Sequence, residues 1–344
     1  MVIAFRSDSI EERNALVEQV GAACRQSGFF QLVNHGIPET LQQDILACSE
    51  ELFSLPLDVK ETYSKDIGGF NRGYERLRAQ NFENKVTKVA LSRSERTKGD
   101  LKEGYYFGLD LPASHPKVAA KTFGLGPNKY PRHVKSPEHF KRTIDTYHTV
   151  MRQLAEDILR TLCATLSVED SWVSQYIETP IAVLRLLHYP PQPPDASELE
   201  RGIGAHTDFG AITILLQDQV GGLQVLDRAT QSWIDVEPTS GALVVNLGNL
   251  MMRWTNDRYM SNLHRVINKT GKERYSVPFF FSGNPHFLVK CFTQFEANQT
   301  QEGAKYPPVT VGEWISGRYA DTYGTSKDKA VSELSVKEAA AGTA

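Results

Sequence analysis

The sequence predicts a mainly β protein with a jelly-roll core and amino-terminal helices packed on that core. Apolar residues recur at helical spacing in the first half, and from about residue 179 the period changes to two. Beyond that point about eight short β-rich segments alternate with Pro, Gly, Asn and Asp, a pattern typical of a sandwich or jelly roll. Such a core is too small to bury both of its faces alone, so we expect the helices to cover it.

The first elements are a helix, a strand and a second helix. Ser9 with Glu12 forms a possible capping box for the first helix, which we expect to end at Gly28. A strand is predicted at residues 29–33, because this apolar stretch stops at an Asn-His-Gly turn. The second helix is indicated by apolar residues at steps of four, three and four, namely Leu41, Ile45, Cys48 and Leu52.

Residues 64–133 are predicted to be irregular. They include a basic run from Lys85 to Lys102, which we interpret as a solvated flap, because the interleaved aromatic residues that bind nucleic acid are missing. A long helix is then expected to begin at Ser136 and Pro137, a good N-cap and first-turn pair. Its apolar stripe comprises Phe140, Ile144, Tyr147, Met151, Leu154, Ile158 and Leu162.

The β-rich half supplies the predicted core. The expected strands are 181–189, 206–217, 223–226, 233–236, 242–246, 264–268, 274–281 and 287–292. We therefore divide the chain into a helical and irregular covering region (1–135), a long helix (136–178), the jelly-roll core (179–290), a carboxy-terminal strand and helix (291–324) and a disordered tail (325–344).

Composition excludes several classes of protein. The 344 residues are 40% hydrophobic and 23% charged with a net charge of −3, which provides no basic field for nucleic acid. No apolar run is long enough to span a membrane or to form a secretory signal. The four cysteines lie far apart without a CxxC pair, so we expect reduced, buried thiols in a cytoplasmic protein.

His206-Thr207-Asp208 is the first candidate for chemistry. Nine histidines and 41 acidic residues produce roughly one His-x-Asp/Glu by chance, so the motif alone carries no weight. On a strand, however, His206 and Asp208 project to the same face. His264 lies in a later β-rich segment and is the best candidate for a third ligand. Two histidines and one carboxylate leave three positions open on an octahedral ion, as in non-haem Fe(II) oxygenases.

A candidate anion site follows ten residues later. Arg274 and Ser276 share one face of a predicted strand, and the residues after them are strongly apolar. A guanidinium in such surroundings needs an anionic partner, and a carboxylate bound in bidentate fashion is the natural one.

In these residues the sequence resembles the isopenicillin N synthase-like family of Fe(II)/2-oxoglutarate-dependent oxygenases. The resemblance extends over roughly residues 10 to 320. The matching segments are GFFQLVNHGIP at 28–38, YPP at 189–191, HTDFG at 206–210, LLQD at 215–218, GGLQV at 221–225, NLG at 246–248, LHRV at 263–266 and RYS at 274–276.

The resemblance implies a double-stranded β-helix with iron at one mouth of the barrel. It implies that His206, Asp208 and His264 are the iron ligands. It also implies that Arg274 and Ser276 hold the distal carboxylate of 2-oxoglutarate, with Tyr189 on the same co-substrate. The walls of the substrate pocket are expected to include Arg185, Phe209, Phe279 and Phe281, with Phe70 and Tyr105 from the irregular segment acting as a lid. For Arg185 a surface ion pair is the alternative.

The function implied is that of an Fe(II)- and 2-oxoglutarate-dependent dioxygenase of secondary metabolism. It would use O2 to hydroxylate, desaturate or cyclise a small organic metabolite, with release of succinate and CO2. One alternative is an oxidase like isopenicillin N synthase, which uses O2 without 2-oxoglutarate. A second is a jelly-roll binding protein with an idle metal site. We expect a monomer or weak homodimer whose partner is a small molecule, without a nucleic-acid or membrane partner.

Overall fold

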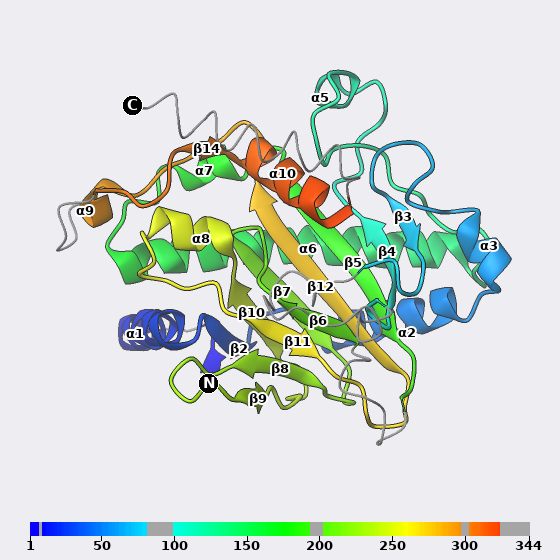
Figure 1. Cartoon of the computed structure of the whole chain (residues 1–344), viewed down its shortest axis with the longest axis horizontal. Coiled ribbons are helices and arrows are strands. Elements are labelled where there is room, and N and C mark those ends of the chain that lie inside the picture. The colour runs from blue at the N-terminus through cyan, green and yellow to red at the C-terminus, as the bar shows by residue number, and fades with distance from the viewer. Residues whose placement is uncertain (7–8, 81–98, 193–201, 297–302, 324–344) are drawn as a thin grey trace, which may run out of the picture.

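The computed structural model describes residues 1–6, 9–80, 99–192, 202–296 and 303–323, and two β-sheets face each other in it (Figure 1). Among these residues an eight-stranded sheet, the major sheet, has the order β1-β2-β10-β7-β12-β5-β4-β3. A four-stranded sheet, the minor sheet, has the order β6-β11-β8-β9, and β13 pairs with β14.

The strands have the following bounds. The major sheet contains β1 (Val2–Ala4), β2 (Phe29–Val33), β3 (Gly73–Glu75), β4 (Glu103–Phe107), β5 (Ile181–Tyr189), β7 (Ile212–Gln217), β10 (Leu243–Leu247) and β12 (Arg274–Gly283). The minor sheet contains β6 (Ile203–His206), β8 (Leu223–Leu226), β9 (Trp233–Asp235) and β11 (His264–Val266). The remaining pair is β13 (Leu288–Val289) and β14 (Val309–Thr310).

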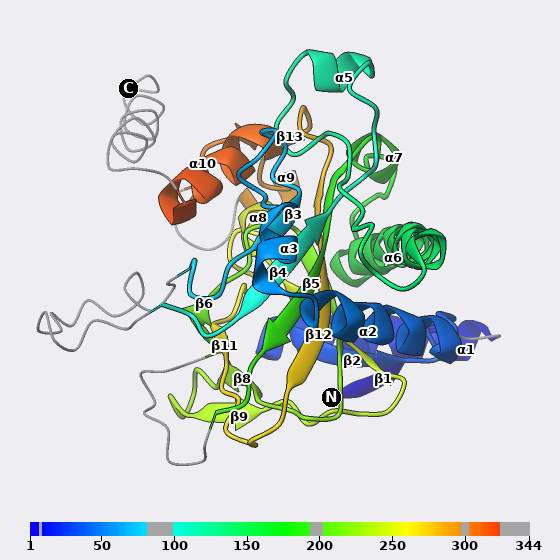
Figure 2. The ribbon, with the colours of Figure 1, turned by 90° about the vertical axis from the view of Figure 1, so that its right-hand side faces the viewer.

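Helices cover one face of the major sheet and the minor sheet covers the other (Figure 2). The covering helices are α1 (Ile10–Gln26), α2 (Glu39–Phe53) and α6 (Pro137–Leu166). The others are α3 (Leu57–Glu61), α5 (Pro116–Ala119), α7 (Val173–Tyr176), α8 (Asn249–Trp254), α9 (Thr293–Glu296) and α10 (Val311–Tyr323). The larger apolar core lies between these helices and the major sheet, and a smaller one lies between the two sheets.

The predicted starts and stops of the first helices are confirmed. Ser9 caps α1, accepting a hydrogen bond from the amide of Glu12 at 3.1 Å. Gly28 adopts a positive φ of 70°, and a Cβ there would collide with the carbonyl of Met260, so glycine suits this turn. Pro137 opens α6, and all seven residues of the predicted stripe are buried.

The fold class is confirmed as a jelly roll with helical cover, but the segment 64–133 is more regular than expected. It contains β3, β4 and α5, and β4 pairs with the core strand β5. Lys102 was predicted to be solvated, yet it is buried and forms an ion pair with Glu75 at 3.4 Å. The part of the basic run from Lys85 to residue 98 and the tail at 325–344 lie outside the described residues.

Two further properties bear on the expectations from composition. All four cysteines are buried and free. In the described part of the chain, the helices are too short or too polar to cross a bilayer.

Candidate active site

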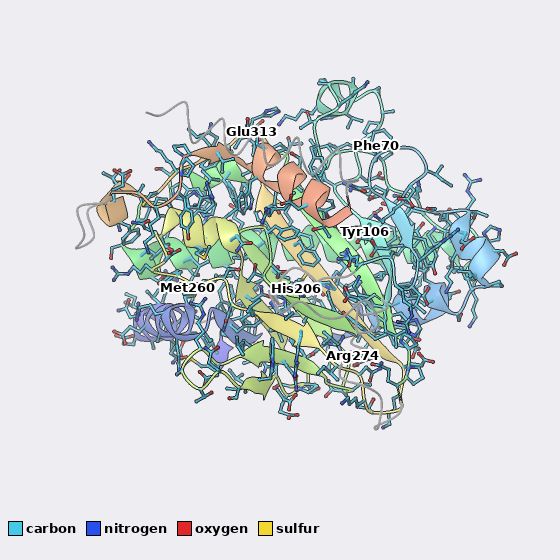
Figure 3. The ribbon with its side chains drawn as sticks, in the orientation of Figure 1. Phe70, Tyr106, His206, Met260, Arg274 and Glu313 are labelled. Atoms are coloured by element: carbon cyan, nitrogen blue, oxygen red, sulfur yellow. The ribbon has the colours of Figure 1, made fainter. Side chains whose placement is uncertain are left out.

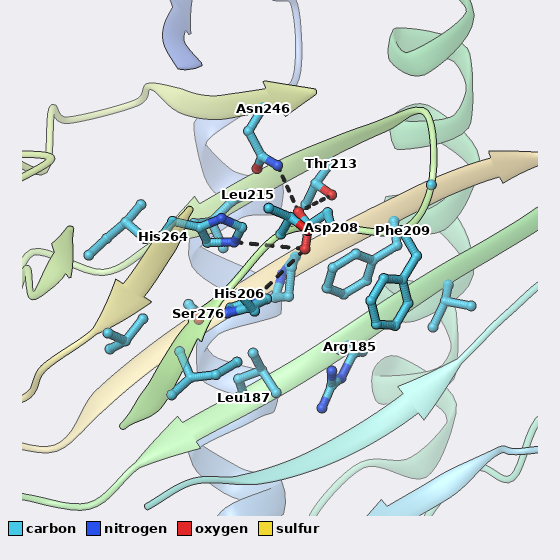
Figure 4. Close-up of a pocket in the computed structure, with 18 of the residues that line it drawn as sticks. Arg185, Leu187, His206, Asp208, Phe209, Thr213, Leu215, Asn246, His264 and Ser276 are labelled. Atoms are coloured by element: carbon cyan, nitrogen blue, oxygen red, sulfur yellow. Dashed lines mark hydrogen bonds and ion pairs between the residues drawn. The ribbon is translucent and has the colours of Figure 1, made fainter. Parts of the chain in front are cut away.

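His206, Asp208 and His264 meet between the two sheets. His206 is the last residue of β6 and His264 the first of β11, and the two pair in register, with ring centroids 4.2 Å apart. Asp208 Oδ1 lies 3.8 Å from Nε2 of His206 and 3.7 Å from Nε2 of His264. All three candidate ligand atoms lie within 4.8 Å of one another (Figure 4).

The route by which Asp208 reaches this point differs from the prediction. We expected one strand to carry both His206 and Asp208, but β6 ends at His206. Asp208 lies in the turn that leads to β7, and the backbone carbonyl of Asp208 accepts the amide of Asn249 at 2.8 Å. The turn, rather than strand alternation, therefore brings the carboxylate to the histidines.

Hydrogen bonds orient all three side chains for a metal ion. Nδ1 of His206 lies 2.8 Å from the carbonyl of Gly204, and Nδ1 of His264 lies 3.2 Å from that of Asn262. If each Nδ1 carries the proton and donates it there, each Nε2 keeps a lone pair for a metal. Oδ2 of Asp208 accepts hydrogen bonds from Thr213 Oγ1 and Asn246 Nδ2, at 2.6 and 2.7 Å, which leaves Oδ1 facing the histidines. Two imidazoles and a carboxylate suit Fe(II).

The electrostatics of the site favour a neutral His206 beside an ionised Asp208. Burial and the neighbouring His264 lower the pKa of His206 to about 3. Burial alone would raise the pKa of Asp208, but the two histidines and the hydrogen bonds from Asn246 and Thr213 outweigh burial and lower it. These are the protonation states that bind a cation.

Arg274 forms a second feature of the same cavity. Its side chain is fully buried, with Cζ 4.7 Å from the centre of the Tyr189 ring. It donates hydrogen bonds to the carbonyl of Gly221 at 2.6 Å, to Gln217 Oε1 at 3.2 Å and to Ser276 Oγ at 3.4 Å. These partners are neutral, and a buried guanidinium is stabilised only when an anion compensates for its lost hydration. The residues therefore fit a carboxylate such as the distal one of 2-oxoglutarate.

The cavity has a volume of about 110 Å³ and brings together most of the predicted site residues. Its walls include the metal triad and the predicted residues Tyr189, Arg274, Ser276, Arg185 and Phe209.

Phe279 and Phe281 do not line the cavity, contrary to the prediction. Along β12 the cavity is lined by every second residue from Arg274, which includes Pro278 and Phe280. Phe279 and Phe281 point to the other face, where they are fully buried, and Phe279 contacts His148 of α6. Strand alternation, applied from Arg274 onward, would have selected Phe280 instead.

Phe70 and Tyr105 also lie away from the cavity wall. Tyr105 is buried in β4 and donates its hydroxyl to the carbonyl of Lys129 at 2.9 Å. Phe70 packs against Gly126, and Figure 3 places it far from His206. The wall at this end comes instead from α10, through Ile315, Tyr319 and Thr322. The sequence does not predict that α10 lines the cavity. Helical spacing shows which face of a helix is apolar, but it does not show which part of the molecule that face packs against.

The comparisons with known proteins agree with this geometry. Residues 180–283 match the 2OG-Fe(II) oxygenase superfamily, and residues 2–133 match the family described as non-haem dioxygenase in morphine synthesis N-terminal. The chain is 47% identical over 313 residues to the 2-oxoglutarate-Fe(II) type oxidoreductase hxnY of Emericella nidulans, covering 91% of this chain and 86% of that protein. It is 36% identical to the clavatol oxidase claD of Penicillium crustosum, covering 90% of each.

A solved structure extends the similarity to three dimensions. A full-length Neurospora crassa protein, crystallised in complex with alpha-KG, superposes with a TM-score of 0.79 at 25% identity, covering 93% of this chain and 95% of that one. Both sheets, the metal triad and sequence identity over nine-tenths of the chain therefore lead to one conclusion. The chain belongs to the 2OG-Fe(II) oxygenase superfamily.

Proposed function

We propose that this protein is an Fe(II)- and 2-oxoglutarate-dependent dioxygenase that oxidises a small organic metabolite and releases succinate and CO2. The main support for this proposal is that a metal-ligand triad and a buried arginine line the same cavity. Three converging ligand atoms suit Fe(II), and the buried Arg274 suits the distal carboxylate of 2-oxoglutarate. The names of the relatives support dependence on 2-oxoglutarate over the oxidase alternative.

Each residue has a definite task in this proposal. Nε2 of His206, Oδ1 of Asp208 and Nε2 of His264 hold the iron and leave three positions open. When bound, iron supplies the centre at which O2 is activated and 2-oxoglutarate is oxidatively decarboxylated. Arg274 and Ser276 bind the far carboxylate of 2-oxoglutarate, and Tyr189 stacks on the Arg274 guanidinium and fixes its direction.

The protein determines the product by holding one C–H bond of the substrate near the metal. Phe209 follows Asp208 directly, and Phe280 lies on the cavity face of β12. These apolar side chains exclude water and position the substrate, while Arg185 contributes a polar group to the same space. Hydroxylation, desaturation or ring closure follows from which hydrogen is held in reach.

The test is production of succinate from 2-oxoglutarate by the purified protein with Fe(II), O2 and a panel of small metabolites. We expect succinate to form in the native protein and to fall at least a hundredfold in H206A. The matched control is H139A, because His139 is exposed on α6 and far along the chain from the cavity residues. Oxidation of substrate without succinate would favour the oxidase alternative, and full activity of H206A would exclude the proposed triad.

Arg274→Leu tests the co-substrate site separately. Removal of one member of a buried charge pair costs about 3–5 kcal/mol, so the apparent KM for 2-oxoglutarate should rise by two orders of magnitude or more. Binding of Mn(II) should be unchanged, because Arg274 does not contact the triad through any described hydrogen bond. An unaltered KM would show that the anion site lies elsewhere.

A further inference from the structure

The two histidines of the metal triad are held in the same way. Nδ1 of His206 lies 2.8 Å from the carbonyl of Gly204, and Nδ1 of His264 lies 3.2 Å from the carbonyl of Asn262. In both cases the carbonyl belongs to the residue two positions earlier. Such a hydrogen bond fixes an imidazole only as firmly as the carbonyl itself is fixed. The backbone at Gly204 and Asn262 therefore helps to determine how accurately the two Nε2 atoms face Asp208 (Figure 4).

Asn262 fixes its own backbone with its side chain. Its Nδ2 donates a hydrogen bond to the carbonyl of Leu226 at 2.9 Å, and its Oδ1 accepts the amide of Leu263 at 2.9 Å. Leu226 is the last residue of β8, which pairs directly with β11. The carbonyl beside His264 is thus attached to the minor sheet by local contacts.

Gly204 has no side chain for this purpose, and it lies on an edge strand. In the described part of the chain β6 pairs with β11 alone, and the register includes Ile203 and His206 but not Gly204. The register also shifts between these two positions. Because an irregular edge strand leaves backbone groups without a partner in the sheet, Gly204 needs a contact from outside the minor sheet.

Asp100 provides that contact. Its Oδ1 accepts a hydrogen bond from the amide of Gly204 at 2.9 Å, although the two residues are 104 positions apart in the chain. The side chain is buried, with 4% of the residue exposed, and a carboxylate is the strongest acceptor that a side chain offers to an amide. The amide of Gly204 is therefore held by Asp100, while its carbonyl lies beside the ring of His206.

The backbone of Asp100 is itself fixed on both sides. Its amide donates to the carbonyl of Gln80 at 2.7 Å, and its carbonyl accepts the amide of Lys102 at 2.9 Å. Lys102 is buried, and attraction to Glu75 and Asp100 opposes the lowering of its pKa by burial and by Arg185, so a positive charge accompanies the carboxylate.

These contacts connect the two sheets. Three residues after Asp100 the chain enters β4, which pairs with β5 of the major sheet. Asp100 is thus anchored beside the major sheet while its carboxylate holds a strand of the minor sheet. The distance between the sheets at His206 depends on this link.

We propose that Asp100 is a positioning residue for the metal centre: its carboxylate anchors Gly204 and, through Gly204, fixes the direction in which Nε2 of His206 points. The inference rests on the proposed function, because it takes His206 as a metal ligand. Asp100 is not among the residues that line the cavity, so it acts on the metal through His206 and not by contact with the co-substrate or substrate.

Two substitutions of similar volume separate the hydrogen bond from the bulk of the side chain. Asp100→Asn keeps an oxygen that can accept the Gly204 amide, whereas Asp100→Leu removes it. Isothermal titration calorimetry with Mn(II) measures metal affinity, and the visible absorption of bound Co(II) reports the arrangement of the ligands. Loss of a partner that orients a ligand weakens metal binding by about 10- to 100-fold, and because Asp100 acts one step further out we expect about tenfold for D100L. Its Co(II) spectrum should change, while D100N should keep the native spectrum and an affinity close to that of the native protein.

Asp110→Leu is the matched control. Oδ1 of Asp110 also accepts a backbone amide, that of Asn128 at 2.8 Å, but Asp110 does not line the cavity. D110L should therefore bind Mn(II) as tightly as the native protein and give the same Co(II) spectrum. The affinity of D100L for 2-oxoglutarate, measured with saturating Mn(II), should also be native, because the described hydrogen bonds of Arg274 do not involve Asp100.

The outcomes distinguish a positioning role from a general loss of structure. The proposal is overturned if D100L keeps the native affinity and spectrum, if D100N loses as much affinity as D100L, or if D100L weakens binding of 2-oxoglutarate as much as binding of Mn(II). If circular dichroism shows that D100L does not fold, Asp100→Ser replaces it with the same expectation, since the serine hydroxyl is too short to reach Gly204. If the native protein failed to bind Mn(II), the proposed function would fail and this inference with it. Native binding with an unaffected D100L would exclude only the role of Asp100.

Discussion

The two carboxylate oxygens of Asp208 have different partners. Oδ2 accepts hydrogen bonds from Thr213 and Asn246, and Oδ1 faces the two histidines. The two donors come from neighbouring strands, β7 and β10, which pair in register at Thr213 and Asn246. The major sheet therefore sets the rotation of a side chain that belongs to the turn after β6, and this rotation selects a single oxygen for the metal.

Thr213→Val removes one of these hydrogen bonds while keeping the volume of the side chain. Loss of a hydrogen bond to a metal-ligating carboxylate lowers metal affinity by about 10- to 100-fold, and we expect a loss in that range for Mn(II). Isothermal titration calorimetry with Mn(II) measures this affinity. Thr161→Val on α6 deletes a similar hydroxyl bonded to the carbonyl of Asp157 and should leave affinity unchanged. Equal affinities in all three proteins would show that Thr213 does not orient Asp208.

Much of the site could be predicted from the sequence at this scale, and the errors have a physical cause. The triad and the Arg-x-Ser pair are short patterns whose residues all meet in the cavity. Aromatic character alone favours Phe279 and Phe281 as wall residues, but alternation from Arg274 assigns both to the opposite face of β12. Tyr319 could not be found, because its place on the cavity depends on where α10 docks.

At the scale of elements, α10 covers one end of the cavity. Figure 1 shows it lying across the major sheet near the ends of β5 and β12. Trp314 attaches it, because its Nε1 donates a hydrogen bond to the carbonyl of Phe209 at 2.9 Å. Phe209 follows Asp208, so this bond joins the covering helix to the backbone beside a metal ligand.

Trp314→Phe removes this donor and keeps an aromatic ring. A hydrogen bond of this kind contributes about 1 kcal/mol, so opening of α10 should become about fivefold more frequent. Hydrogen exchange of amides in 311–323 would measure the change. Trp233→Phe in β9, where the ring contacts Arg265 on the outside of the cavity, is the control and should leave α10 exchange unchanged. Unaltered exchange in W314F would mean that other contacts hold the helix.

Most elements of the jelly roll were predictable, whereas β3, β4 and the break between β6 and β7 were not. Segments such as 181–189 and 223–226 are β-rich and end at turn residues, so their own sequence predicts them. β4 begins with Glu103 and Gly104, which local propensity assigns to a loop. Glu103 is tolerated because Lys60, Tyr74 and His188 bind its carboxylate, and those partners lie 29 to 85 residues away in the chain.

At the scale of the whole molecule, His188 links two strands and the start of a third. Its Nδ1 lies 2.8 Å from Glu103 of β4, and its Nε2 lies 2.5 Å from Glu273, which precedes β12. Burial alone would lower the pKa of His188, but the two glutamates outweigh burial and raise it above 6.5. The protonated imidazolium is thus the form that stabilises this edge of the sheet.

This raised pKa predicts how stability depends on pH. The contribution of His188 is fully present below about pH 6.5 and is lost as pH rises through the folded-state pKa, since unfolding then releases a proton. The slope from one proton is at most about 1.4 kcal/mol per pH unit, and partial exposure reduces it. Urea unfolding between pH 6 and 8 should therefore show a steeper decline in the native protein than in H188Q. Parallel declines would exclude His188 as the group responsible.

The lowered pKa of Asp208 predicts how the metal site contributes to the stability of the whole molecule. Because its neighbours hold this pKa below the usual value of an aspartate, the ionised carboxylate stabilises the folded state at neutral pH, and this contribution is lost as pH falls through the folded-state pKa. Asp208→Asn removes the charge and keeps an oxygen for Thr213 and Asn246. We therefore expect metal-free D208N to be less stable than the native protein at neutral pH.

Mn(II) should increase this difference. At 100 times its dissociation constant the ion should stabilise only the native protein, by about 2.7 kcal/mol. Unfolding in urea with and without Mn(II) measures both effects, and D235N, which changes an exposed aspartate of β9, should behave as native. If metal-free D208N were more stable than the native protein, burial of the Asp208 charge would outweigh its hydrogen bonds and the nearby histidines, and the charge would be retained for the metal alone.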